Sequence, residues 1–201
     1  MSGALYRVTG PAFSASFDTT QVHVTQVGSG TFTFTDVNNG TFTYTVNGIT
    51  QSKSITRTIF SSPVPVCTSG GTQGATPNFQ DLWWRSTESG WGVNITHQGD
   101  ILFATWFTFS ANSNGKGLWL VMSNGNKTAT NTYSGVLYRT SGPAFNAVPF
   151  DPQMVVLTEV GTGTFTFSDA NNGVFAYTVD GVTQSKPITR NVFATPATVC
   201  K

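Results

Sequence analysis

Charged side chains are scarce in this chain of 201 residues. Only 9% are Asp, Glu, Lys or Arg, whereas a typical soluble domain is about one quarter charged. The formal net charge is +1 and no run of basic residues occurs, which argues against nucleic acid or an anionic lipid surface as a partner. Long apolar runs are also missing. The sequence therefore predicts no membrane insertion, because a spanning helix needs about 20 apolar residues.

Residues that build helices are few as well. The chain has seven Leu and two Glu, whereas Thr occurs 33 times and Phe 16 times. Leu and Glu favour helices, while Thr and aromatic residues fit the pleated surface of a β-sheet. The composition therefore argues against a mainly helical protein. A hydrophobic fraction of 38% also argues against disorder, because it supplies enough apolar side chains for a core.

An internal repeat organises the chain. Residues 2–67 reappear as 134–200, so that SGALYRVTGPAF matches SGVLYRTSGPAF and PVPVC matches PATVC. The offset is 132 residues at first and 133 after one extra residue near Pro149. This period is about one domain long, far above that of solenoid repeats. Residues 78–133, which hold all five Trp, have no earlier copy.

The repeat predicts three regions. Residues 1–62 are the C-terminal half of a preceding repeat unit, residues 63–77 are a linker rich in Ser, Thr, Gly and Pro, and residues 78–201 are a complete unit. Met1 stands where the second copy has Tyr133, so the simplest interpretation is a fragment that starts inside a longer tandem array. The leading half then packs on the complete unit, pairs with a neighbouring unit or another chain, or remains an open sheet.

The residue pattern predicts an all-β fold. Segments 31–35 and 41–45, which read TFTFT and TFTYT, alternate with period two and so place aromatic rings on one face and Thr on the other. Asn47-Gly48 and Asp180-Gly181 are dipeptides typical of two-residue hairpin turns. We expect an antiparallel up-and-down meander that forms a barrel or a two-sheet sandwich of about eight strands, preceded by a four-strand half-repeat.

Glycine positions indicate where these strands turn or bend. Gly161-Thr162-Gly163 and its first copy, Gly28-Ser29-Gly30, fall inside extended runs and predict a bulge or sharp bend. Asn124-Gly125-Asn126 is interpreted as a turn. The strands expected in the complete unit lie near 80–85, 90–98, 101–110, 117–124, 131–141, 154–168 (as one strand or two), 173–180 and 182–193.

The segment from 81 to 120 carries the most distinctive motifs. It reads DLWW, then ESGWGVNITHQGD, then ILFATWFTF and LWL. At these residues the chain resembles an uncharacterised family of secreted bacterial tandem-repeat β domains, with a core of ESGWG-x-N-x-x-HQGD followed by FATWF. The resemblance covers the whole complete unit, and the first half matches the C-terminal half of that family. It implies a bacterial, secreted or cell-surface protein, and it implies no mechanism.

The five Trp have two interpretations. Sugars stack their apolar faces on aromatic rings, so the Trp are candidates for a ligand site, and core packing is the other interpretation. Trp83 and Trp84 are adjacent and point to opposite faces of a strand, so at most one of them enters a barrel core. Trp106 lies in a run that is apolar on both faces, which suits core packing.

A polar cluster of Glu88, His97, Gln98 and Asp100 lies near these Trp. Strand alternation places His97 on the apolar face, so a core histidine with satisfied hydrogen bonds is weighed against a ligand contact. The other histidine, His23, is not repeated in the second copy. A metal ion needs several ligands, and the sequence therefore predicts no metal site and no cofactor.

The two cysteines, Cys67 and Cys200, occupy equivalent positions one period apart, just beyond the last strand of each unit. In an exported array each pairs with a cysteine of a neighbouring linker, or the two pair with each other.

We expect a non-enzymatic binding or adhesion module for a glycan or a small apolar ligand, with Trp83, Trp91, His97 and Gln98 in the contact site. The alternative is a purely structural spacer repeat. A hydrolase that uses Glu88 or His97 is the third candidate, and no residue is assigned a catalytic role. An apolar pocket or an exposed row of aromatic rings with convergent polar groups would favour binding, whereas burial of all five Trp would favour the spacer.

Overall fold

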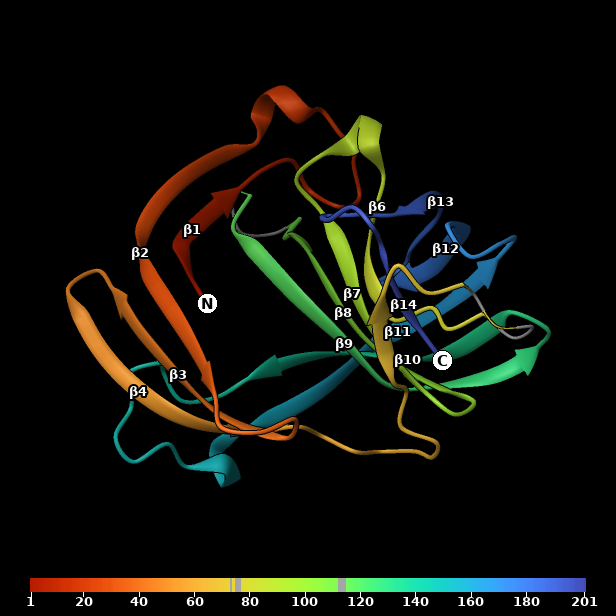
Figure 1. Ribbon diagram of the computed structural model, residues 1–201. Coiled ribbons are helices and arrows are strands. Elements are labelled where there is room, and N and C mark those ends of the chain that lie inside the picture. The colour runs from red at the N-terminus through yellow and green to blue at the C-terminus, as the bar shows by residue number, and fades with distance from the viewer. Residues whose placement is uncertain (73, 75–76, 112–114) are drawn as a thin grey trace.

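The computed structural model describes residues 1–72, 74, 77–111 and 115–201 (Figure 1). The all-β class is confirmed. Three one-turn 3-10 segments, at Thr19–Gln21, Ser86–Glu88 and Pro152–Met154, are the only helical elements in these ranges. The described strands are β1 (Ser2–Thr9), β2 (His23–Phe34), β3 (Asn39–Val46), β4 (Ile49–Thr56), β5 (Cys67–Ser69), β6 (Asp81–Trp84), β7 (Gly92–Gln98), β8 (Ile101–Phe109), β9 (Gly117–Ala129), β10 (Thr132–Ser141), β11 (Val156–Phe167), β12 (Asn172–Val179), β13 (Val182–Arg190) and β14 (Thr198–Cys200).

Strands β6 to β13 form a closed barrel in which each strand pairs antiparallel with its sequence neighbours. The ring closes where β13 pairs with β6, through Thr189 opposite Trp84 and Arg190 opposite Trp83. Of the two expected architectures, the up-and-down barrel is therefore the one formed. No helix in the described part of the chain has the length and apolar character needed to cross a membrane.

Strands β1 to β4 form a separate four-stranded sheet that repeats the pairing of β10 to β13. Phe32 lies opposite Phe42 in this sheet, as Phe165 lies opposite Phe175 in the barrel. Figure 1 shows this sheet curving beside the barrel. The expected four-strand half-repeat is thus present as an open sheet. Its aromatic face has no second half of a barrel opposite it among the described residues.

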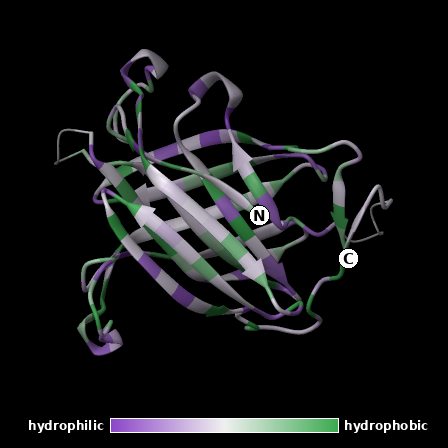
Figure 2. Cartoon of the chain, turned by 60° about the vertical axis from the view of Figure 1, so that its left-hand side comes forward, coloured by the Kyte–Doolittle hydropathy of each residue, from purple (hydrophilic) through white to green (hydrophobic). Residues whose placement is uncertain are grey.

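The barrel core is rich in aromatic side chains. Phe165 and Phe175 are fully buried and stack with ring centroids 4.4 Å apart, and Trp106 meets the edge of Phe175 at 5.3 Å. Hydrophilic and hydrophobic residues alternate along many strands (Figure 2), as expected when one face of each strand points inward. Full burial of one large apolar side chain contributes roughly 1.5–3 kcal/mol to the free energy of unfolding, so the inner rings are a main source of stability.

Turn chemistry follows the sequence at the two hairpin dipeptides. Asn47 and Gly48 both have positive φ, and so do Asp180 and Gly181, as type I′ turns require. The expected bulge is also present, because the pairing of β10 with β11 shifts register between Leu137 and Tyr138, opposite Gly161.

The turn expected at Asn124-Gly125-Asn126 is wrong, because these residues lie inside the long strand β9. Gly125 is a point of close approach: a Cβ there would lie 2.7 Å from the Met122 sulfur and 3.1 Å from the Leu102 carbonyl oxygen. The chain reverses further on, at Asn131, which has a φ of 55°. A glycine between two asparagines is typical of turns, and here tight packing in an irregular strand pair explains it.

Each repeat contributes a loop that packs against the other repeat. The loop between β1 and β2 packs at one end of the barrel, and the loop between β10 and β11 packs on the β1–β4 sheet. Phe13 lies in the barrel 5.6 Å from the Trp106 ring, and its carbonyl accepts a hydrogen bond of 3.4 Å from the Tyr177 hydroxyl. The equivalent Phe145 lies on the open sheet, where its carbonyl accepts a bond of 3.0 Å from the Tyr44 hydroxyl. The two repeats therefore exchange equivalent loops.

The C-terminal ends of the two repeats are joined covalently. Strand β5 pairs antiparallel with β14, and Cys67 and Cys200 lie opposite each other and form a disulfide. Of the pairings left open by the sequence, the bond within the chain is the one observed.

Replacement of Gly161 by Ala should destabilise the barrel by about 3 kcal/mol or more. Gly161 has a φ of 151° and an added Cβ would collide with the Thr178 carbonyl oxygen across the strand pair, so both strain and overlap oppose the substitution. Gly181→Ala is the matched control, because Gly181 also has positive φ but open space around it, and should cost about 1–2 kcal/mol. Urea unfolding followed by Trp fluorescence measures both, and equal losses would contradict the expectation.

Candidate functional site

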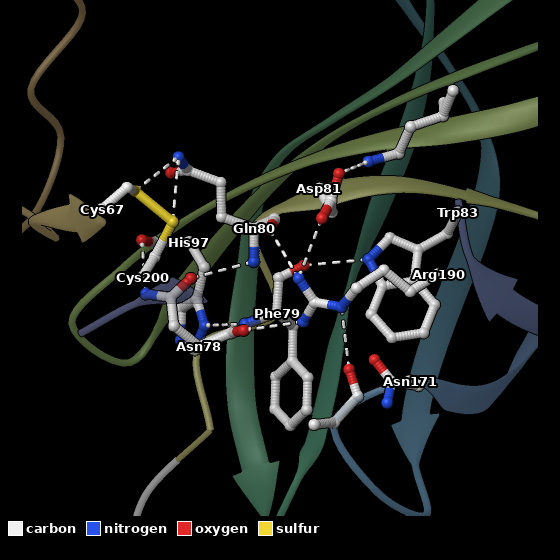
Figure 3. Close-up of polar contacts among 12 residues, drawn as sticks. Cys67, Asn78, Phe79, Gln80, Asp81, Trp83, His97, Asn171, Arg190 and Cys200 are labelled. Atoms are coloured by element: carbon white, nitrogen blue, oxygen red, sulfur yellow. Dashed lines mark hydrogen bonds and ion pairs between the residues drawn. A yellow bond between two sulfur atoms is a disulfide. The ribbon is translucent and has the colours of Figure 1, made fainter. Parts of the chain in front are cut away.

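Trp83, the first of the predicted contact residues, lies fully inside the barrel (Figure 3). Its indole Nε1 donates a hydrogen bond of 2.9 Å to the Phe79 carbonyl, and the Arg190 guanidinium lies 5.1 Å from its ring centroid. The adjacent Trp84 is half-buried on the outer side of β6. The inference that only one of this pair enters the core is confirmed.

The Arg190 guanidinium forms hydrogen bonds where β13 meets β6, the seam at which the barrel closes (Figure 3). It donates to the carbonyl oxygens of Asn78 at 2.9 Å and Gln80 at 3.1 Å, and to the Asp81 carboxylate at 3.0 Å. A fourth bond reaches the Ala170 carbonyl at 2.9 Å. The seam has few backbone pairs, so this buried ion pair, with its extra acceptors, replaces part of the missing ladder.

His97 is a core histidine with both ring nitrogens engaged. Nδ1 accepts a hydrogen bond of 3.0 Å from the Phe79 backbone N–H, and Nε2 lies 3.3 Å from the Tyr133 hydroxyl. An accepting Nδ1 places the proton of the neutral ring on Nε2. Burial is the largest influence on the pKa of His97 and lowers it, against the opposing effects of a backbone hydrogen bond with Gly99 and of the Asp100 charge.

Gln98 holds the segment that follows β4. Its Oε1 accepts hydrogen bonds from the backbone N–H groups of Phe60 at 3.0 Å and Ser61 at 3.3 Å, and its Nε2 donates to the Thr58 carbonyl at 3.0 Å. Gln98 is only 1% exposed. Its polar atoms are thus occupied by the chain itself, and its observed role is to anchor this segment on the barrel.

Trp91 belongs to an ion-pair cluster centred on Glu88. The indole N–H donates to Oε2 of Glu88 at 2.9 Å, Lys186 donates to the same oxygen at 2.9 Å, and Arg85 donates to Oε1 at 2.9 Å. The Lys186 ammonium also lies 5.9 Å from the Trp91 ring centroid. Burial raises the pKa of the nearby Tyr177 hydroxyl, and the Glu88 charge raises it further. The cluster joins the segment before β7 to β13.

The structure brings together only two of the four predicted contact residues. Trp83 and His97 both pack on Phe79, at ring-centroid distances of 6.5 and 5.7 Å. Trp91 packs in the Glu88 cluster, and Gln98 faces the segment after β4. These four side chains hold internal contacts, and they do not converge on one open surface.

An open cleft lies elsewhere, between the outer wall of the barrel and the outer face of β1 and β2. It has a volume of about 450 Å³. Trp84, Phe107 and Trp119 line the barrel side, and Tyr6 and Val24 line the other side. Trp119 is 54% exposed, with its ring centroid 5.7 Å from that of Phe107. Trp91 reaches this cleft with a small part of its surface.

The sequence-based selection missed Trp84 and Trp119. Alternation along β6 indicates the outward position of Trp84, because adjacent residues of a strand face opposite sides and Trp83 faces the core. Trp119 alternates in the same way with Leu118 and Leu120, of which Leu120 is fully buried. What sequence could not supply is the opposite wall, because β1 and β2 meet the barrel through contacts between distant segments, such as the bridge of Thr9 with Lys116.

Comparisons of this chain with models of protein families, with curated proteins and with solved structures give no match.

Protonation of His97 should make the protein less stable in acid. The unfolded imidazole has a pKa near 6.5, and the folded pKa lies lower, so the unfolded state binds more protons below pH 6.5. The free energy of unfolding should therefore be constant above about pH 7 and fall as the pH decreases through 6.5, by at most about 1.4 kcal/mol per pH unit. Urea unfolding between pH 7.5 and 5 measures this slope.

His97→Asn should flatten the slope, because the Asn side-chain oxygen can still accept the Phe79 N–H bond but does not titrate. His23→Asn is the control, since His23 is exposed, and should retain the slope. The interpretation fails if the two variants show the same pH dependence.

Proposed function

We propose that this protein is a non-enzymatic binding module of an exported bacterial repeat protein and that it holds a small ligand with an apolar face in the cleft lined by Trp84 and Trp119. The observation that carries the proposal is the exposed Trp119 ring in an apolar cleft of about 450 Å³. Ligand pockets in proteins typically measure about 300–1,000 Å³ and are lined by apolar and aromatic side chains.

Polar groups at the cleft support the same proposal. The side chains of Tyr6, Ser89 and Asn191 line it, and within the described part of the chain they hold no hydrogen bond. A few free polar groups among apolar walls are the usual means of orienting a ligand. A sugar ring, which has one apolar face and a rim of hydroxyls, matches this combination, and so does a small apolar molecule with one or two polar atoms.

Secretion is part of the proposal and rests on the family resemblance. The Cys67–Cys200 disulfide supports it, because such bonds persist mainly in oxidising compartments outside the cytoplasm.

A structural spacer repeat is the second candidate. The exchange of Phe13 and Phe145 between the two sheets favours it, because such contacts fix neighbouring units against each other. The exposed Trp119 argues against a pure spacer, since a spacer gains nothing from a solvent-facing indole in an apolar cleft.

Trp119→Ala should weaken binding at least tenfold, because it removes the most accessible aromatic surface of the cleft. The probes are N-phenyl-1-naphthylamine, a neutral apolar dye measured by fluorescence, and a glycan array on the same purified chain. Phe193→Ala is the control, since Phe193 is 74% exposed and lies outside the cleft, and should bind like the parent chain. Absence of saturable binding to both probes, or equal losses in the two variants, would refute the proposal.

A further inference from the structure

The inner face of the β1–β4 sheet is the exposed counterpart of the barrel interior. Phe32 and Phe34 are 41% and 55% exposed, whereas their equivalents in the second repeat, Phe165 and Phe167, are 0% and 3% exposed. The pairing register is the same in both sheets. The same aromatic face is thus buried in one repeat and open in the other. Exposed apolar surfaces of this kind mark interaction sites.

In the barrel, side chains at the start of the complete unit and from β6 to β9 cover that face. Phe79 stacks on Phe167 at 3.8 Å and Trp83 packs on the same ring at 4.8 Å. Trp106 meets the edge of Phe175 at 5.3 Å. The open sheet keeps the equivalent rings, with Phe34 in the place of Phe167. These rings define what the missing cover must supply.

Two cations of the open sheet also lack carboxylate partners among the described residues, although the Lys53 ammonium lies 6.0 Å from the Phe150 ring centroid. Arg57 and Lys53 are the equivalents of Arg190 and Lys186, which bind Asp81 and Glu88 at 3.0 and 2.9 Å. Arg57 is exposed, and within the described ranges neither Arg57 nor Lys53 forms an ion pair. The open sheet therefore presents apolar rings and two cations that match a segment with two carboxylates spaced like Asp81 and Glu88.

One end of the open sheet is covered by a loop, as the equivalent end of the barrel is. The Tyr44 hydroxyl donates 2.6 Å to Gln51, and the Gln51 amide donates 3.0 Å to the Asn146 carbonyl. Tyr177 and Gln184 form the same arrangement with the Phe13 loop in the barrel. In the part of the chain that the structure describes, Phe13 contacts the Tyr177 and Trp106 rings, whereas Phe145 contacts the Tyr44 ring and lacks a counterpart of Trp106.

The strand edges leave room for the missing half. In the barrel, β10 pairs with β9 only as far as Arg139, whose equivalent in β1 is Arg7. The backbone of β1 meets that of the barrel at the bridge of Thr9 with Lys116 and where the Val8 carbonyl approaches Gly117, both beyond that point. The edge of β1 required for closure is therefore free of this bridge, and β4 is the other edge of its sheet.

We propose that the β1–β4 sheet is an acceptor that closes into a second eight-stranded barrel by binding a four-stranded β6–β9-type half from another repeat unit. Carboxylates equivalent to Asp81 and Glu88 bind Arg57 and Lys53, and aromatic side chains equivalent to Phe79, Trp83 and Trp106 cover the open face. The β6–β9 half of this chain is already used by its own barrel. Closure uses the inner face of β1–β4, whereas the ligand cleft uses the outer face, so the two proposals are independent.

The test compares the present chain with an extended chain that carries an added copy of residues 78–132 directly before Met1. Hydrogen exchange followed by mass spectrometry reports on residues 31–46 and on their counterparts at 164–179. In the present chain, residues 31–46 should exchange at least tenfold faster than the counterparts. In the extended chain the two rates should converge, while residues 164–179 keep their protection and so verify the original barrel.

Charge reversal separates the proposed seam from nonspecific burial. In the extended chain, Arg57→Glu should restore fast exchange of residues 31–46, and Asp81→Arg in the added copy alone should reverse that loss. Lys201→Glu is the control for a change of charge alone, because Lys201 is exposed and lies outside both the open sheet and the barrel, and should leave the exchange rate unchanged.

Three results would overturn the proposal: fast exchange of residues 31–46 in the extended chain, equal effects of Arg57→Glu and Lys201→Glu, or a dimer of the present chain by light scattering with residues 31–46 already protected. The last result would assign the open face to a second copy of the same sheet. A monomer with fast exchange before extension and slow exchange after it supports the proposal.

Discussion

Closure of the barrel depends on one buried guanidinium. Strands β13 and β6 share only two residue pairs, too few to hold a ring of eight strands by backbone hydrogen bonds alone. Arg190 supplies three further hydrogen bonds across this seam, one of them to the Asp81 carboxylate, and a fourth to the Ala170 carbonyl in the turn between β11 and β12. An unpaired buried cation would be strongly destabilising. The guanidinium is stable in the interior because these oxygen acceptors surround it. Burial of Trp83 and of the rings behind it follows from this closure.

The same chemistry explains the difference between the two repeats. Arg57 keeps the backbone bond that its equivalent makes, to the Asn38 carbonyl, but its guanidinium is exposed. The strands and turns of β1 to β4 form without a partner because their hydrogen bonds and hairpins are local. The burial of Phe32 and Phe34, by contrast, needs a second sheet. Local pairing and long-range covering are therefore separable steps in this fold.

Local patterns predicted most of the architecture. Period-two alternation and the hairpin dipeptides lead to the all-β meander, and Asp180-Gly181 has the backbone geometry that its residues indicate. Asn124-Gly125-Asn126 misled because a glycine required by side-chain packing looks the same in sequence as a glycine required by a turn. The candidate site was harder to predict, since burial of His97 and exposure of Trp119 depend on which distant segment covers each face.

The Cys67–Cys200 disulfide has a mechanical consequence. It joins the linker before β6 to strand β14 after the barrel, so the whole eight-stranded barrel lies within one covalent loop. Tension applied along the chain passes from one cysteine to the other and bypasses the strands between them. A single proteolytic cut in a barrel loop likewise leaves both pieces attached. The barrel can therefore open and refold without breaking the covalent path between Cys67 and Cys200.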